Sequence, residues 1–124
     1  MGSVEHRMEL IYQGVVQGEI SLERWVETCS TSPARMFGMY PKKGIIAPGS
    51  DADILVWDPN GKTKIGINDK HHMNMDHSSW EGFKVDGKVD TVLSRGMVVV
   101  EKDTFTGKKG HGKFIKRDLC QYLN

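Results

Sequence analysis

The residues best suited to chemistry lie in one polar segment, residues 69–77, which contains three histidines and two aspartates. Imidazole and carboxylate groups are ligands that zinc accepts in proteins. The spacing does not favour a single metal site, because the adjacent His71 and His72 would point to opposite sides of an extended segment. We therefore interpret the segment as a solvated or interface loop. Its candidate ligands are Asp69, His71, His72, Asp76 and His77.

Two other places in the sequence combine groups that could perform acid–base chemistry. Glu5 stands beside His6 and Arg7, but a carboxylate in the first turn of a helix is more simply a partner of the helix dipole. Arg7 is expected to tie that helix to a neighbouring loop by a charge-assisted hydrogen bond. Asp51 and Asp53 lead into a strand, where Asp51 is expected to accept backbone N–H groups within a turn.

A third candidate site is the basic segment Lys108–Arg117 near the end of the chain. Such a segment could bind phosphate or RNA. It lacks the signature of an RNA-binding module, however, and aromatic residues do not alternate with its charges. We predict a solvated tail, or one that wraps a neighbouring subunit.

The elements that must position these residues begin with helices in the first third of the chain. Apolar residues recur there at intervals of three and four, as in an amphipathic helix. Ser3 is a suitable N-cap for the first helix, and Gly18 a suitable stop. A second helix is expected from Ser21. A third, short helix is expected from Ser32-Pro33, with the proline at its first position, and Gly38 should end it.

Short strands are expected after these helices. Asp53–Trp57 reads as a buried strand, Asp58–Gly61 as a turn, and Thr63–Ile67 as a returning strand. Val89–Val100 reads as a hairpin that turns at Arg95-Gly96. Helices followed by strands indicate the α+β class. Two hairpins alone are only marginally stable, so we expect further strands or a covering layer.

Length and composition fit one ordinary domain: 124 residues, of which 17 are basic and 16 acidic, for a net charge of +1. This balance gives no reason to expect a nucleic-acid or membrane partner. No apolar run approaches the roughly 18 residues of a membrane span, and the N-terminus lacks the apolar core of a signal peptide. Cys29 and Cys120 fit reduced thiols, so we expect a cytoplasmic location.

One segment, Ser32–Ile54, carries a recognisable series of motifs. Pro-Ala-x-x-Phe-Gly ends a helix, Lys-Gly-x-Ile follows, and Gly-Ser-Asp-Ala-Asp precedes an apolar strand. This series resembles the amidohydrolase superfamily, where it marks the chain leaving a (β/α)8 barrel for a flanking β-sandwich. Further segments resemble its hydantoinase–dihydropyrimidinase branch: Ser3–Met8, Met39–Pro41, Ser79–Gly82, Gly87–Gly96 and Gly110–Phe114.

The resemblance implies hydrolytic opening of a cyclic amide by a hydroxide held on two zinc ions. The family's ligands are a His-x-His pair, a bridging carbamylated lysine, two further histidines and an aspartate, and none matches a position here. Met1-Gly2-Ser3 stands where the family has an Asn-Gly that contacts substrate. We therefore expect no catalytic, cofactor-binding or metal-binding residue in this chain, and no bound zinc. The resemblance places the active site of the parent enzyme upstream of Met1.

These observations predict an α+β fragment in three parts. Residues 1–40 would be the last helices of the barrel, 41–103 part of the β-sandwich, and 104–124 a C-terminal oligomerisation tail. The implied partners are the rest of the barrel, a cyclic amide, and other copies in a dimer or tetramer. Three alternatives stay open: a barrel supplied as another chain or within a longer product, a non-catalytic dihydropyrimidinase-like assembly or interaction protein, and an independent small β domain.

Overall fold

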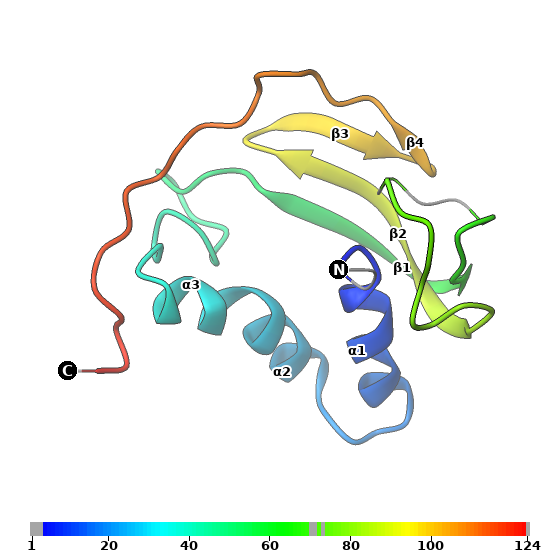
Figure 1. Ribbon diagram of the computed structural model, residues 1–124. Helices are drawn as coiled ribbons and strands as arrows, with labels where there is room; N and C mark the ends of the chain where they lie inside the picture. The colour runs from blue at the N-terminus through cyan, green and yellow to red at the C-terminus, as the bar shows by residue number, and fades with distance from the viewer. Residues whose placement is uncertain (1–3, 70–71, 73, 124) are drawn as a thin grey trace.

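The computed structural model describes residues 4–69, 72 and 74–123. Helices occupy the first third of the chain and a four-stranded antiparallel sheet follows, which confirms the α+β class. The helices lie on one side of the sheet, and the C-terminal segment runs from the end of the sheet back to them (Figure 1). No helix within these described residues has the length and apolar character needed to cross a membrane.

The first helix, α1 (Arg7–Val16), begins later than expected. Ser3, the predicted N-cap, lies outside the described residues, and His6 occupies the N-cap position without a side-chain capping bond. Glu5 and His6 form a turn ahead of the helix. Glu5 is therefore not in the first helical turn, and its carboxylate accepts the backbone N–H of the distant His72. Gly18, at φ +75°, follows the helix as expected.

The second and third predicted helices are one continuous helical segment. α2 (Leu22–Val26) starts as expected, because the Ser21 hydroxyl accepts the Arg24 N–H at 3.1 Å. It continues through a π-helical turn, η1 (Glu27–Thr31), into α3 (Ser32–Met36). Pro33 has no N–H to offer the carbonyl four residues earlier, that of Cys29. The Arg7 guanidinium donates to that carbonyl instead, at 3.4 Å.

Three aromatic side chains join the helices to the sheet. Tyr12 of α1, Trp25 of α2 and Trp57 of β1 (Ile54–Lys64) pack with ring centroids 4.8–5.1 Å apart. Tyr12 and Trp25 are buried, and the Trp25 indole N–H donates to the Met8 carbonyl at 3.2 Å. Each such ring pair contributes about 0.5–1.5 kcal/mol beyond the area that it buries. This cluster is the main hydrophobic core of the described chain.

The sheet has the order β1-β2-β3-β4, with β2 (Lys84–Ser94), β3 (Met97–Glu101) and β4 (Thr104–Phe105). The predicted hairpin at Arg95-Gly96 is confirmed. Both turn residues have positive φ, 46° and 80°, as a tight turn between twisted strands requires. β4 was not anticipated, because two residues are too few to show an alternating pattern.

The predicted turn at Asp58–Gly61 and the returning strand Thr63–Ile67 were wrong. The chain continues through Asp58–Gly61 within β1, which ends at Lys64, and β2 is its partner both before and after these residues. The register shifts between the pairs Asp58↔Lys88 and Lys62↔Asp86, so the turn-forming residues make a bulge. Within it, the Asp58 side chain accepts the Asn60 N–H at 3.0 Å, a local bond that satisfies the bulged backbone without reversing the chain.

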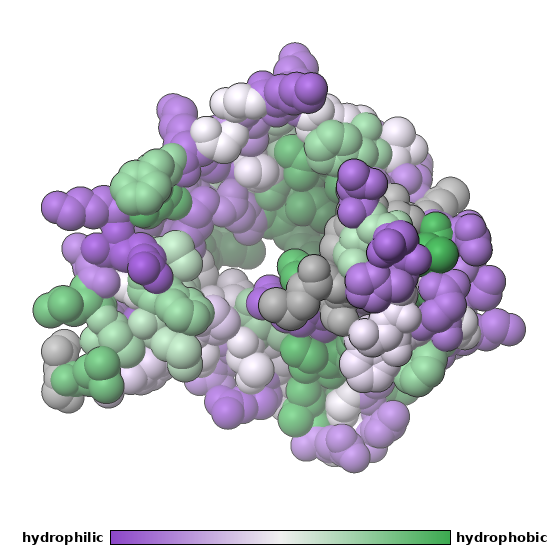
Figure 2. Space-filling view, in the orientation of Figure 1, coloured by the Kyte–Doolittle hydropathy of each residue, from purple (hydrophilic) through white to green (hydrophobic). Residues whose placement is uncertain are grey.

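The C-terminal segment is fastened to the end of α3 by polar contacts. The Asp118 N–H donates to the Gly38 carbonyl at 2.8 Å, and the Gln121 N–H donates to the Arg35 carbonyl at 3.1 Å. The Gln121 side chain also reaches the Tyr40 carbonyl at 3.0 Å. Three of its apolar side chains face solvent, because Phe114, Leu119 and Leu123 are each at least 84% exposed. Figure 2 shows hydrophobic residues at this outer edge.

Candidate functional site

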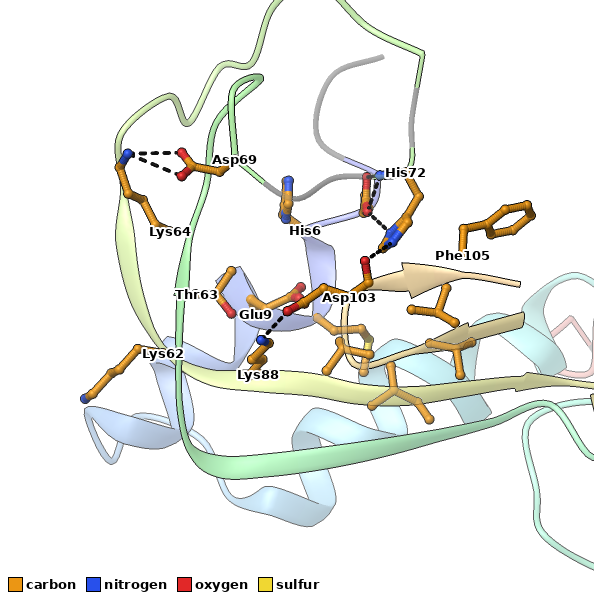
Figure 3. A pocket seen from close by; sticks show the side chains of 16 residues that line it. His6, Glu9, Lys62, Thr63, Lys64, Asp69, His72, Lys88, Asp103 and Phe105 are labelled. Carbon is orange, nitrogen blue, oxygen red and sulfur yellow. Dashed lines mark hydrogen bonds and ion pairs between the residues drawn. The ribbon is translucent and has the colours of Figure 1, made fainter. Parts of the chain in front are cut away.

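A pocket of about 620 Å³ lies between the start of α1 and the sheet. Apolar side chains from all four strands form one wall, and the start of α1 and the segment around residue 72 supply polar ones (Figure 3). The apolar wall consists of Leu55, Val89, Val92, Val100 and Phe105. The pocket therefore combines an apolar surface with charged groups close to it.

Three of the acidic side chains around this pocket have a basic partner. Lys88 on β2 pairs with Asp103 at 2.5 Å, and Lys64 on β1 pairs with Asp69 at 3.1 Å. Glu5 pairs with the imidazole of His72 at 2.7 Å. The same Glu5 carboxylate accepts the backbone N–H of His72 at 2.8 and 2.9 Å, so it also fixes the polar segment against the start of α1.

Glu9 is the exception among the acidic side chains of the pocket. It is 6% exposed, and its Oε2 atom has no hydrogen-bond partner among the described residues. Burial raises the pKa of Glu9 above its ordinary value, and the nearby charge of Glu5 also raises it. A hydrogen bond from the backbone N–H of Glu9 lowers the pKa, but by less than burial raises it. Sequence reasoning missed Glu9. The available signal was its position three residues before the buried Tyr12, which places it on the core side of the helix.

The candidate metal ligands of the polar segment do not converge. His71 lies outside the described residues, and His72 and Asp69 are engaged with Glu5 and Lys64. The His77 imidazole lies 2.7 Å from the Asp76 carboxylate, with both side chains exposed. Within the described part of the chain, no three His, Cys, Asp or Glu residues are grouped so that they could hold a metal ion.

The aspartates before β1 form ion pairs with lysines. We had expected Asp51 to accept backbone N–H groups within a turn. Asp51 accepts from Lys42 at 2.8 Å and Lys43 at 2.9 Å, and these bonds lower its pKa to about 2. The backbone N–H bond expected at Asp51 is found at Asp53, whose carboxylate accepts the Arg95 N–H at 2.8 Å. Asp53 also pairs with Lys43. These contacts anchor β1 to the β2–β3 turn.

Arg7 and the basic segment also make structural contacts. Arg7 reaches the Cys29 carbonyl in η1, which is a contact within this chain. In the segment Lys108–Arg117, the Arg95 guanidinium donates to the His111 carbonyl, and the His111 Nε2 lies 2.8 Å from the Ser94 carbonyl. The β2–β3 turn therefore holds the start of the tail.

Residues 2–99 match the profile of the family described as "Amidohydrolase family". The chain belongs to this family. It is 54% identical over 123 residues to a D-hydantoinase of Streptomyces coelicolor, a match that covers 99% of this chain and 26% of that protein. It is 50% identical over 114 residues to a D-hydantoinase of Ralstonia pickettii, covering 92% of this chain and 25% of the relative. The chain thus spans about a quarter of these amidohydrolases.

Solved structures of family members show the same fold in the matched region. A D-hydantoinase (dihydropyrimidinase) from Thermus sp. matches 94% of this chain and 26% of its own with a TM-score of 0.87 at 41% identity. A D-hydantoinase structure matches 93% of this chain and 25% of its own with a TM-score of 0.86 at 48% identity. The helices, the four-stranded sheet and their arrangement therefore match part of these solved hydantoinase structures.

Proposed function

We propose that this chain is the C-terminal portion of a cyclic amidohydrolase of the hydantoinase–dihydropyrimidinase type. The parent enzyme would hydrolyse a ring C–N bond of a cyclic amide. The observation that carries this proposal is the 54% identity to a D-hydantoinase along 99% of the chain. In this view the chain contributes the last helices of the barrel and part of the β-sandwich, and it does not catalyse the reaction alone.

The metal chemistry of the parent is also part of the proposal. Two zinc ions would supply an activated hydroxide and polarise the ring carbonyl. The described residues do not fit that role, because the His and Asp side chains of the polar segment are paired with other groups or stand apart. We therefore assign no catalytic step to these residues, and we expect the zinc ligands elsewhere in the parent.

A chimera tests this assignment. The quarter of the Streptomyces coelicolor D-hydantoinase that matches this chain would be replaced by residues 2–124, and ring opening of hydantoin and dihydrouracil would be measured. We expect a folded enzyme that hydrolyses a cyclic amide and holds about two zinc ions per chain. The matched control is the same hydantoinase without its last quarter, which should lack activity. A folded chimera with no ring-opening activity would refute the proposal, as would hydrolysis by the 124-residue chain alone.

The C-terminal tail is proposed to contact a second copy of the parent in the cytoplasm. The contacts that fasten it to the end of α3 are made by backbone and polar groups, whereas the Phe114, Leu119 and Leu123 side chains are exposed. Full burial of one such side chain contributes about 1.5–3 kcal/mol. Three of them on each copy would offset much of the entropy lost when the tail is ordered.

The oligomer can be tested in the chimera by light scattering. Replacing Phe114, Leu119 and Leu123 by serine should produce smaller species that remain folded. The control variant replaces Lys108, Lys109 and Lys113 by serine, which changes the same tail without removing apolar surface. An unchanged oligomer with unchanged thermal stability after the apolar substitutions would exclude the tail as a subunit contact.

A further inference from the structure

We propose that the pocket between α1 and the sheet binds an organic cation, a protonated amine or a guanidinium on an apolar stem, with Glu9 as its counter-ion. The pocket holds about 620 Å³, which is a common size for small-molecule sites. Figure 3 shows Glu9 among the side chains that line this pocket.

The choice of a cation follows from the charges around the pocket. Asp69, Asp103 and Glu5 each have a basic partner, at 3.1, 2.5 and 2.7 Å respectively. Only 6% of Glu9 is exposed, and its Oε2 atom has no hydrogen-bond partner in the described chain. A charge-assisted hydrogen bond from an arriving cation would give this Oε2 atom a partner and stabilise the ionised form of the buried carboxylate.

The apolar stem follows from the apolar wall of the pocket. All four strands contribute apolar side chains to that wall, among them Leu55, Val92 and Phe105. A ligand with an alkyl or aryl body would remove part of this apolar surface from water, which favours binding. A small hydrated metal ion would gain nothing from such a wall, and the pocket offers no group of three metal ligands among its described residues.

Titration of the 124-residue chain with N-butylguanidinium, followed by amide chemical shifts, tests the site. We expect saturable binding with a Kd of about 1 mM, and shifts at Val89, Val92 and Val100. Neutral N-butylurea has the same shape and should bind about tenfold more weakly, because it lacks the charge-assisted bond. Comparing these two probes shows whether binding requires a positive charge on the ligand, and no residue of the protein has to be changed.

Glu9→Gln should weaken N-butylguanidinium binding about tenfold or more, while Glu23→Gln, at an exposed position of α2, should leave it unchanged. Absence of saturable binding, equal affinity for both probes, or unchanged affinity after Glu9→Gln would each overturn the proposal.

The cation could be a basic side chain of the parent polypeptide or a free small molecule. The first of these sources presupposes the larger parent enzyme, so the distinction between them rests on the proposed function. The chimera separates the two sources. If it still binds N-butylguanidinium, the ligand is free. If it does not, and Glu9→Gln lowers its melting temperature, a basic side chain of the parent fills the pocket. Loss of binding with no effect of Glu9→Gln on melting would contradict the site. Ring-opening activity is measured separately, so failure of the cation site does not decide the proposed function.

Discussion

The side-chain amide of Gln13 pairs with the backbone of Asp86 through two reciprocal hydrogen bonds. The Gln13 Nε2 donates to the Asp86 carbonyl at 2.9 Å, and the Gln13 Oε1 accepts the Asp86 N–H at 3.1 Å. Asp86 lies on β2 beside the bulge of β1. A residue of α1 thus satisfies the strand's backbone where the register of the sheet shifts.

Substitution of Gln13 by leucine should destabilise the chain by about 1–3 kcal/mol, because both backbone groups of Asp86 would lose their partner. The measurement is the urea midpoint of unfolding, followed by tryptophan fluorescence. Gln17→Leu is the matched control, since its side chain is exposed at the end of the same helix and should change stability by less than about 0.5 kcal/mol. Equal effects of the two substitutions would show that the paired hydrogen bonds contribute little.

Gly87→Ala should disrupt the contact between α1 and the sheet. Gly87 has φ +83°, and an added Cβ would lie 2.3 Å from the Trp57 ring and 2.9 Å from the Tyr12 ring. Gly82→Ala is the control, because Gly82 has φ +81° and open space around it. Gly82→Ala should cost about 1–2 kcal/mol for the left-handed backbone alone, and Gly87→Ala clearly more. Calorimetric unfolding would measure both, and similar losses would mean that the rings move aside freely.

Asp51 predicts a specific dependence of stability on pH. Its bonds with Lys42 and Lys43 lower its pKa from 3.8 to about 2, so the folded state favours the ionised form. The stabilisation is therefore complete above the unfolded pKa and is lost as the pH falls from about 4 toward 2. Asp51→Asn should lower the urea midpoint at pH 6, and the difference from the unsubstituted chain should shrink toward pH 2.

Two further measurements check the role of Asp51. Replacing both Lys42 and Lys43 by glutamine should produce the same loss of pH dependence, because it removes the cause of the low pKa. In the chimera, Asp51→Asn should leave ring-opening activity per folded enzyme nearly unchanged. A stable variant with collapsed turnover would identify Asp51 as a catalytic carboxylate, contrary to our interpretation.

Gly38→Ala should release the C-terminal tail from α3. An added Cβ at Gly38 would lie 1.9 Å from the Asp118 carbonyl oxygen, so the tail could not keep its present course. A loss of about 1.4 kcal/mol in tail contacts would raise the population of molecules with a detached tail about tenfold. The rate of trypsin cleavage after Lys116 and Arg117 should rise by the same factor, because cleavage follows the detached population. Gly18→Ala, with φ +75° and no neighbour within 4 Å, controls for backbone strain. Unchanged cleavage would show that the tail is held elsewhere.

Sequence patterns predicted the elements whose signals are local. The Ser21 N-cap, the stop at Gly18 and the Arg95-Gly96 hairpin were predicted because one or two residues determine each of them. The passage through Asp58–Gly61 could not be predicted in the same way. Its turn-forming residues are compatible with a reversal or a bulge, and the long pairing with β2 decides between them.

The site depended on contacts between distant residues, which local patterns do not show. The pair of Glu5 and His72 joins positions 67 residues apart, and α1 begins at Arg7, beyond this contact. Glu9 was identifiable only from the helical face that it shares with Tyr12. The family resemblance, in contrast, was visible in contiguous motifs, and the family match is confirmed.

The bulge in β1 also has a consequence for how the protein behaves at high concentration. Among the described strands β1 is an edge of the sheet, and an open edge can recruit a strand from another molecule and start aggregation. Pro59 lies within the bulge, offers no N–H to such a strand, and interrupts the long edge at its middle. The same residues that misled the turn prediction thus leave this edge without a continuous row of backbone groups to which another strand could pair.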